Sequence, residues 1–474
     1  MRKAKIVCTL GPATDYEGGI LELVKAGMNV ARINASHGSH PEHEGRIDLV
    51  RAAAEELKRP IAVLVDLQGP KIRLGRFIEG PHYLNIGDKF TITTRDVEGT
   101  KDICSTTFKG LAGDCNPGDI LLIDDGKVAV RVLEVKDGTD VVTEVEVPGN
   151  VSNNKGINLP GVAVSIPALS KKDEEDLRWG LRYGADMIAL SFVRNAKDIE
   201  DVHRIMDEEG VRRPVIAKIE KPQAVENLKE IVQSFDGIMV ARGDLGVELP
   251  LEQVPIVQKR AISLCREFAK PVILATQVLE SMIDNPRPTR AEASDCANAI
   301  LDGADAVMLS GETSVGKFPI ICVKTMANIV NYTETEGLGL IPPIHEPDVT
   351  LNRAISRSAL EIAEALNARE VVVYTETGHS ARQMTRHRSR IPVIAFTPHK
   401  KVRNQLALLW GARSYLAEKT AKTTDQVVAQ VDMKMREYGL GQDGDVVVIV
   451  AGMPMGIAGS TNTIRVHTIG EEVG

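Results

Sequence analysis

Aromatic residues are scarce in this sequence. They make up 4% of its 474 residues, and the formal net charge is −8 at pH 7. Proteins that bind single-stranded nucleic acid stack bases on aromatic side chains, and broad nucleic-acid surfaces carry excess positive charge. The composition therefore argues against nucleic acid as a partner.

The chain also lacks paired cysteines and long apolar runs. Its six cysteines show no CxxC spacing, so buried, unreactive thiols are the favoured interpretation and a zinc site is the weaker alternative. No apolar stretch is long enough to cross a bilayer, and no signal peptide precedes the first expected strand. We therefore expect a cytoplasmic protein that does not enter a membrane.

Short, continuous apolar runs separated by amphipathic helical patterns are abundant. Such strands are buried on both faces, which is typical of a parallel sheet covered by helices. The eight runs are Lys5–Thr9, Asn29–Asn34, Ile61–Asp66, Met187–Ser191, Val215–Ile219, Gly237–Ala241, Val272–Ala275 and Ala306–Leu309. This α/β pattern predicts a closed (β/α)₈ TIM barrel; a doubly wound open sheet is the alternative.

Two regions interrupt or extend this pattern. After Gly69-Pro70, alternating runs and turn pairs such as Asp125-Gly126 predict an inserted β-barrel lid. A Gly- and Pro-rich linker over residues 337–347 precedes a second α/β region. The strands expected in these two regions are Lys89–Thr94, Ile120–Ile123, Val128–Val135, Val141–Val147, Glu370–Tyr374, Ile391–Phe396, Asp445–Ala451 and Thr463–His467. The expected domains are a catalytic barrel (1–69 and 167–338), a β lid (70–166) and a C-terminal α/β effector-binding domain (339–474).

Polar side chains gather where the expected barrel strands end. Arg32 and Asp66 lie at the ends of the second and third runs, Lys218 and Glu220 at the fifth, and Asp244 follows the sixth. The carboxyl ends of barrel strands meet at one face, where active sites lie. Carboxylates suit a divalent cation, and basic side chains suit phosphate. A surface salt bridge explains any one of these residues, but the full set predicts metal-assisted phosphoryl or enolate chemistry.

Longer motifs resemble those of pyruvate kinases over nearly the whole chain. They are Lys5–Ala13 (KIVCTLGPA), Arg32–Gly38 (RINASHG), Asn154–Gly161 (NKGINLPG), Ala275–Met282 (ATQVLESM), Pro286–Glu292 (PRPTRAE) and Ser310–Thr313 (SGET). Ala35 stands where many members carry Phe. The combination of motifs, rather than any single one, is specific for this family.

The resemblance implies that phosphoenolpyruvate, ADP and a proton give pyruvate and ATP in glycolysis. Lys218 and Arg32 would hold the phosphoryl group, Glu220 and Asp244 would hold Mg²⁺ or Mn²⁺, and the enolate would be protonated near Thr276. The implied substrate-binding residues are Ala241, Arg242, Gly243, Asp244 and Thr276, and the implied nucleotide contacts are His37, Arg73 and Lys155.

The resemblance also implies regulation and assembly. A loop in the C-terminal domain of the family binds a phosphorylated sugar, and the matching residues are Thr375, Thr377, Gly378, His379 and Ser380. Glu376 adds a negative charge, which makes a sugar monophosphate as acceptable as a bisphosphate; an N-cap loop without a ligand is the alternative. The loop 452–462 would close over this site. A bacterial-type homotetramer is implied.

Several alternatives remain open. The chain could be a magnesium-dependent lyase or aldolase that acts through pyruvate enolate, or a catalytically inactive metabolite sensor. The nucleotide contacts argue against the first, and intact Lys218, Glu220, Asp244 and Thr276 argue against the second. The basic run Arg382–Arg390 is interpreted as a solvated helix face or subunit contact rather than an RNA-binding patch. His40 and His43 are interpreted as part of a helix start rather than a metal pair.

The monovalent-cation site departs from the family pattern. The family's K⁺ site corresponds to Asn34, Ser36, Asp66 and the carbonyl of Leu67, but potassium-dependent members carry Glu where this chain has Lys71. An ammonium group at this position can supply the charge that K⁺ would bring; the alternative is that Lys71 only pairs with Asp66. We predict pyruvate formation in Na⁺ buffer free of K⁺ at saturating Mg²⁺. Strong activation by K⁺ over Na⁺ in the same assay would reject the idea.

Overall fold

Eight parallel strands form a closed barrel at the centre of the computed structural model, which describes residues 2–162, 164–167, 169–345, 350–417, 423–452 and 461–472. The strands are β1 (Lys5–Thr9), β2 (Val30–Asn34), β3 (Ala62–Asp66), β12 (Met187–Leu190), β13 (Val215–Ile219), β14 (Gly237–Ala241), β15 (Val272–Ala275) and β16 (Ala306–Leu309). Their order is β1-β16-β15-β14-β13-β12-β3-β2. The predicted barrel is confirmed, and the doubly wound alternative is wrong.

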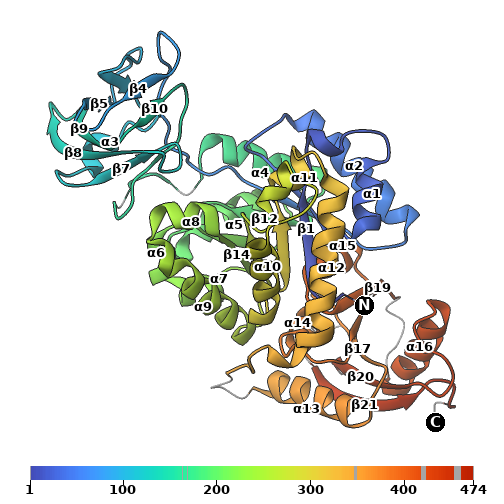
Figure 1. Ribbon diagram of the computed structural model, residues 1–474. Helices are drawn as coiled ribbons and strands as arrows, with labels where there is room; N and C mark the ends of the chain where they lie inside the picture. The colour runs from blue at the N-terminus through green and yellow to red at the C-terminus, as the bar shows by residue number, and fades with distance from the viewer. Residues whose placement is uncertain are drawn as a thin grey trace.

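Helices surround the barrel (Figure 1). They are α1 (Gly19–Ala26), α2 (His40–Glu56), α4 (Lys171–Tyr183), α5 (Ile199–Glu208), α6 (Pro222–Glu226), α7 (Leu228–Ser234), α8 (Arg242–Glu248), α9 (Val254–Glu267), α10 (Arg290–Asp302), α11 (Gly311–Ser314) and α12 (Pro319–Gly337). Short 3₁₀ helices join them: η1 (Pro12–Thr14), η2 (Ala196–Asp198), η3 (Leu251–Gln253), η4 (Glu280–Ile283) and η5 (Leu338–Leu340).

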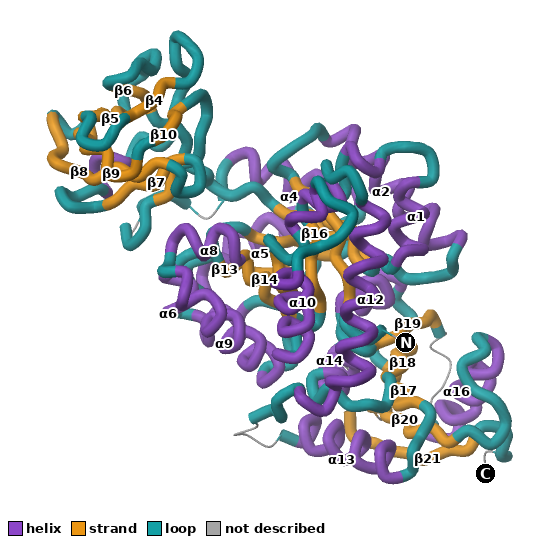
Figure 2. Tube along the Cα trace, viewed as in Figure 1, coloured by secondary structure: helices purple, strands orange, loops and turns teal. Residues whose placement is uncertain are grey.

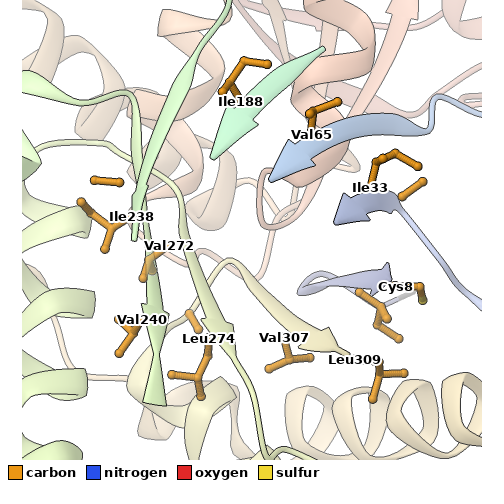
Figure 3. Close-up of a cluster of buried hydrophobic side chains, with 14 of the residues drawn as sticks. Cys8, Ile33, Val65, Ile188, Ile238, Val240, Val272, Leu274, Val307 and Leu309 are labelled. Carbon is orange, nitrogen blue, oxygen red and sulfur yellow. The ribbon is translucent and has the colours of Figure 1, made fainter. Parts of the chain in front are cut away.

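Alternate residues of each barrel strand face the interior, because successive side chains of a strand point to opposite faces. The inward cluster contains Val7, Val30, Ala62, Leu64, Met187, Ala189, Ile216, Met239, Ile273, Ala275, Ala306 and Met308. Figure 3 shows members of the other set, including Ile33, Val65 and Val240, which pack in the core shared with the helices. Arg32, Asp66 and Lys218 each come two residues after an inward-facing residue of the same strand, namely Val30, Leu64 and Ile216. The pleat of the strands therefore directs these charges to the carboxyl mouth of the barrel.

A β region is inserted between β3 and α4 and projects to one side of the barrel (Figures 1 and 2). It contains β4 (His82–Leu84), β5 (Lys89–Thr93), β6 (Ile103–Ser105), α3 (Leu111–Asp114), β7 (Ile120–Ile123), β8 (Val128–Lys136), β9 (Asp140–Val147), β10 (Gly149–Val151) and β11 (Ile157–Asn158). Six strands pair in the order β11-β7-β8-β9-β5-β6, and β10 pairs with β4. Isolated bridges from Arg73 to Gly156 and from Leu74 to Thr106 tie both edges of the larger sheet together.

The C-terminal region is a five-stranded sheet in the order β19-β18-β17-β20-β21, with only β21 antiparallel. Its elements are α13 (Leu351–Ala365), β17 (Glu370–Tyr374), α14 (His379–Thr385), β18 (Val393–Thr397), α15 (Lys400–Gln405), η6 (Leu406–Leu408), β19 (Ala412–Leu416), α16 (Thr424–Glu437), β20 (Val446–Gly452) and β21 (Thr461–Thr468). The exact domain boundaries drawn from the sequence stay a prediction. No helix in the described part of the chain is both long and apolar enough to span a membrane.

The C-terminal sheet region is attached to the amino mouth of the barrel, opposite the charged mouth. Asp305, just before β16, accepts a hydrogen bond from the backbone N–H of Trp410 at 3.1 Å and pairs with Arg388 at 2.8 Å. The ammonium of Lys5 on β1 donates to the carbonyl of Ala412 at 2.8 Å. Burial lowers the pKa of Lys5 to about 7.

The interpretation of the basic run Arg382–Arg390 as a solvated face or subunit contact is wrong for its centre. The Arg388 side chain is 2% exposed and lies against Asp305, and Arg386 donates to the carbonyl of Glu267 at 2.7 Å. These arginines bridge the barrel and the C-terminal region. Sequence alone does not reveal this, because their acceptors lie some 80–120 residues away along the chain.

Candidate active site

The carboxyl mouth of the barrel holds a buried cluster of opposite charges. Asp66, at the end of β3, is 1% exposed, and its Oδ2 lies 2.7 Å from Nε of Arg32 on β2. Its Oδ1 lies 3.5 Å from Nζ of Lys218 on β13. Arg32 also donates from Nη1 to Oγ1 of Thr9 at 2.9 Å. One carboxylate therefore orients two cations that come from either side of β3 in the barrel.

Lys218 is fixed by two further oxygens. Its Nζ lies 2.8 Å from Oε1 of Glu220 and donates to Oγ of Ser191 at 2.7 Å. Burial alone would lower the pKa of Lys218, but the carboxylates of Asp66 and Glu220 outweigh burial and raise the pKa above its ordinary value. Lys218 therefore remains a charged ammonium with a fixed position.

Glu220 and Asp244 form a pair of carboxylates that suits a divalent cation. Burial raises the pKa of Glu220, the ammonium of Lys218 opposes this effect, and the charge of Asp244 adds to it. This repulsion between carboxylates is relieved when a cation lies between them. Within the described ranges, no group of three or more His, Cys, Asp or Glu side chains could hold a metal. A hard cation held by these two carboxylates would need substrate and water oxygens as its other ligands.

The turn after β14 contacts the loop after β15. Helix α8 begins at Arg242, and the backbone N–H of Gly243 donates to Oγ1 of Thr276 at 2.8 Å. Thr276 and Gln277 have positive φ angles of 65° and 55°, a strained conformation that is concentrated at functional sites. The guanidinium of Arg242 is engaged by Asp295 at 2.7 Å and by the carbonyl of Thr276 at 3.1 Å.

Comparisons with known proteins identify the family of the chain. The family model for the pyruvate kinase barrel domain matches residues 1–323, and the model for the pyruvate kinase alpha/beta domain matches residues 353–467. The chain belongs to the pyruvate kinase family. A pyruvate kinase from Corynebacterium efficiens is 56% identical over 99% of this chain and 98% of its own length. One from Mycobacterium tuberculosis is 53% identical over 99% of both chains. A crystal structure of a pyruvate kinase from Cryptosporidium parvum is 35% identical to this chain and superposes with a TM-score of 0.90. The match covers 99% of this chain and 96% of that structure.

The residues that match the family's potassium site are engaged with one another and with their neighbours. Oδ1 of Asn34 accepts the backbone N–H of Ser36 at 3.2 Å, and the carbonyl of Leu67 accepts the hydroxyl of Ser191 at 2.7 Å. Asp66 faces Arg32 and Lys218. Lys71 is exposed and lies in the inserted region next to Gly156, where a Cβ built on Gly156 would be 3.6 Å from Nζ. Among the described residues, Asp66 forms ion pairs with Arg32 and Lys218 but not with Lys71.

The residues that match nucleotide contacts lie in two parts of the molecule. His37 is exposed in the loop between β2 and α2. Arg73 and Lys155 belong to the inserted region, where Arg73 donates to the carbonyl of Asn154 at 3.0 Å and Lys155 pairs with Asp124 at 3.0 Å. A pocket lined by Lys71, Asn158, Phe192, Lys221 and Asp244, among others, lies between the inserted region and the barrel mouth.

The loop expected to bind an effector connects β17 to α14. Oγ1 of Thr375 accepts the backbone N–H of Gly378 at 2.9 Å, and the hydroxyls of Ser380 and Thr461 lie 2.7 Å apart. Gly378 has a φ of 79°, which favours glycine. Thr377 is exposed and His379 begins α14. The predicted closing loop 452–462 falls largely on residues 453–460, outside the described residues.

The histidine pair after β2 is structural, as interpreted from the sequence. His40 begins α2, stacks on Trp179 with ring centroids 4.5 Å apart, and bonds to Asp176 at 2.8 Å. His43 contacts the carbonyl of His37 at 2.8 Å. All six cysteines are free and buried, in keeping with the favoured interpretation.

Sequence reasoning missed the supporting residues of the site. Ser191 and Phe192 are recognisable in the sequence as a strand end, but no role is predicted for them. In the structure Ser191 bonds to Lys218, and the backbone N–H of Phe192 donates to Oε2 of Glu220 at 2.8 Å. These two residues follow β12, which is the neighbour of β13 in the barrel. That position could have indicated contacts with Lys218 and Glu220.

Proposed function

We propose that this member of the pyruvate kinase family transfers the phosphoryl group of phosphoenolpyruvate to ADP, giving pyruvate and ATP in glycolysis. The observation that carries the proposal is the buried Asp66 carboxylate, which holds Arg32 and Lys218 beside the carboxylates of Glu220 and Asp244. Phosphoryl transfer requires cations that hold the charged group in transit and a divalent metal. The two fixed cations support the first role, and the two carboxylates would hold the metal.

The chemistry divides among a few residues. The bond between phosphorus and the C2 oxygen of phosphoenolpyruvate breaks, and a β-phosphate oxygen of ADP bonds to phosphorus. Arg32 and Lys218 hold the negative charge of the group in transit. Glu220 and Asp244 would hold Mg²⁺ or Mn²⁺, which would neutralise negative charge on the substrate. The enolate carbon C3 then takes a proton from water near Thr276, and pyruvate forms.

The inserted region would act as a lid in this proposal. Arg73 and Lys155 would contact the nucleotide from the lid side, and His37 from the barrel side. Ala241, Arg242 and Gly243 would receive the substrate carboxylate through their backbone. Lys71 would replace K⁺ once the lid carries it toward Asp66, since its side chain is exposed and borders the pocket between lid and barrel.

The resemblance to the family also supports proposals about the regulation, the assembly and the cellular location of the protein. A sugar phosphate would bind the loop of Thr375, Thr377, Gly378, His379 and Ser380. Backbone N–H groups and hydroxyls at the start of a helix suit a phosphate. Glu376 is paired with His399 at 2.9 Å, and its carboxylate would disfavour a second phosphate. The protein would be a cytoplasmic homotetramer.

Replacing Lys218 tests the proposed reaction. With phosphoenolpyruvate, ADP and Mg²⁺, we expect wild-type protein to form pyruvate and ATP in equal amounts. In Lys218→Met, we expect the turnover rate to fall by about 10³-fold, the magnitude typical of a lost electrostatic contact to the transition state. Pyruvate is followed by a coupled assay, and folding by circular dichroism.

Lys229→Met, which removes an exposed lysine on α7, is the matched control and should keep wild-type turnover. Pyruvate release by wild-type protein that does not depend on ADP would instead favour a lyase or aldolase. A folded, metal-loaded wild-type protein that forms no pyruvate would favour a metabolite sensor.

A charge introduced into the effector loop tests regulation. We expect a hexose monophosphate to lower the phosphoenolpyruvate concentration needed for half-maximal rate. In Thr377→Glu this response should be lost, because a carboxylate repels phosphate, while Ser358→Glu at an exposed position of α13 should respond normally. If neither hexose monophosphate nor bisphosphate changes the wild-type saturation curve, the loop has no sugar-phosphate role.

A further inference from the structure

Phe192 adopts a strained backbone conformation next to the proposed metal ligand. It follows β12 and has a φ of 54°, in the left-handed region that residues with a Cβ rarely occupy. In this conformation its backbone N–H donates to Oε2 of Glu220 at 2.8 Å. The other oxygen of Glu220 faces Lys218. The orientation of the Glu220 carboxylate therefore depends on the backbone of residue 192.

Contacts of the Phe192 ring hold this conformation. A Cβ built on Gly69 would lie 2.6 Å from Cδ2 of Phe192, so the ring packs directly on the backbone of Gly69. Gly69 has a φ of 75° and its N–H donates to Asp173 at 2.9 Å. Gly69 also lies between β3 and the inserted region, where the chain leaves the barrel. The ring also faces Nζ of Lys221, which lies 5.4 Å from the ring centroid, a cation–π contact.

Lys221 continues this set of contacts to the inserted region. Its ammonium pairs with Glu248, whose side chain is 2% exposed. Oε1 of Glu248 also accepts a hydrogen bond from Nδ2 of Asn158 at 3.1 Å. Asn158 belongs to β11 of the inserted region. An unbroken series of contacts therefore runs from Asn158 through Glu248, Lys221 and the Phe192 ring to Glu220.

We infer that Phe192 is a positioning residue through which the inserted region and the metal-holding carboxylate of Glu220 act on each other. The inference rests on the proposed role of Glu220 as a metal ligand. When Asn158 and Gly69 hold their positions, the ring is clamped and the N–H of residue 192 fixes Oε2. When the inserted region moves away, the clamp loosens and the carboxylate loses this restraint, so metal affinity falls.

Mn²⁺ binding without substrates tests the role of the ring. Phe192→Gly keeps the amide and tolerates the left-handed backbone but removes the ring. We expect it to bind Mn²⁺ about tenfold more weakly than wild type, as loss of a group that orients a ligand commonly does. Phe192→Tyr should restore the affinity. Electron paramagnetic resonance of free Mn²⁺ gives the dissociation constant.

Phe268→Ala, which truncates a half-buried ring after α9, is the control for lost packing and should bind Mn²⁺ normally. Thermal unfolding of each variant reports any general loss of stability. Unchanged Mn²⁺ affinity in folded Phe192→Gly would overturn the inference while leaving the proposed reaction intact. Wild-type protein that forms no pyruvate and binds no Mn²⁺ would overturn both.

A double-mutant cycle tests the connection to the inserted region. Asn158→Ala should weaken Mn²⁺ binding when it is made in wild-type protein. In the Phe192→Gly background it should have little further effect, because removal of the ring has already interrupted the contacts between Asn158 and Glu220. Asn150→Ala, an exposed asparagine elsewhere in the inserted region, should have no effect in either background. Fully additive effects of Asn158→Ala and Phe192→Gly would contradict coupling through Phe192.

Discussion

The structure of the site depends on one carboxylate that is buried at the mouth of the barrel. Asp66 is 1% exposed, and a buried charge without a partner is costly. Arg32 and Lys218 supply the compensating charge, one to each oxygen. Because these cations come from β2 and β13, the neighbouring strands β2, β3, β12 and β13 have to pair in this order before the charges balance. The same interaction that makes the buried carboxylate tolerable fixes the two cations to which we assign the phosphoryl group.

The two ends of the barrel strands make different kinds of contact. β12 follows Asp186, whose Oδ1 contacts Asn404 of the C-terminal region at 3.3 Å. At its other end it leads into Ser191 and Phe192, which contact Lys218 and Glu220. The amino mouth thus anchors the C-terminal region, and the carboxyl mouth holds the polar cluster. At the carboxyl mouth, Phe192, Thr276 and Gln277 have positive φ angles.

Much of this architecture could be predicted from the sequence, for a physical reason. The barrel strands are continuous apolar runs whose ends are marked by polar residues, and the predicted bounds differ from β2, β3 and β12 by a single residue. Short β6 and β11, and β19 with its mixed sequence ARSYL, have no such pattern and were missed. The identities of Lys218 and Glu220 followed from their places at strand ends. Their partners did not, because Ser191, the amide of Phe192 and the burial of Arg388 depend on contacts between segments far apart in the chain.

The most direct test of this account is the catalytic efficiency of Asp66→Asn with phosphoenolpyruvate. The substitution keeps the size of the side chain but removes the charge that orients Arg32 and Lys218. With folding verified by circular dichroism, kcat/KM should fall by about 10³-fold, comparable to the loss of a preorganised electrostatic contact. A folded variant that keeps wild-type kcat/KM would show that the two cations are placed without this carboxylate, and would contradict the account.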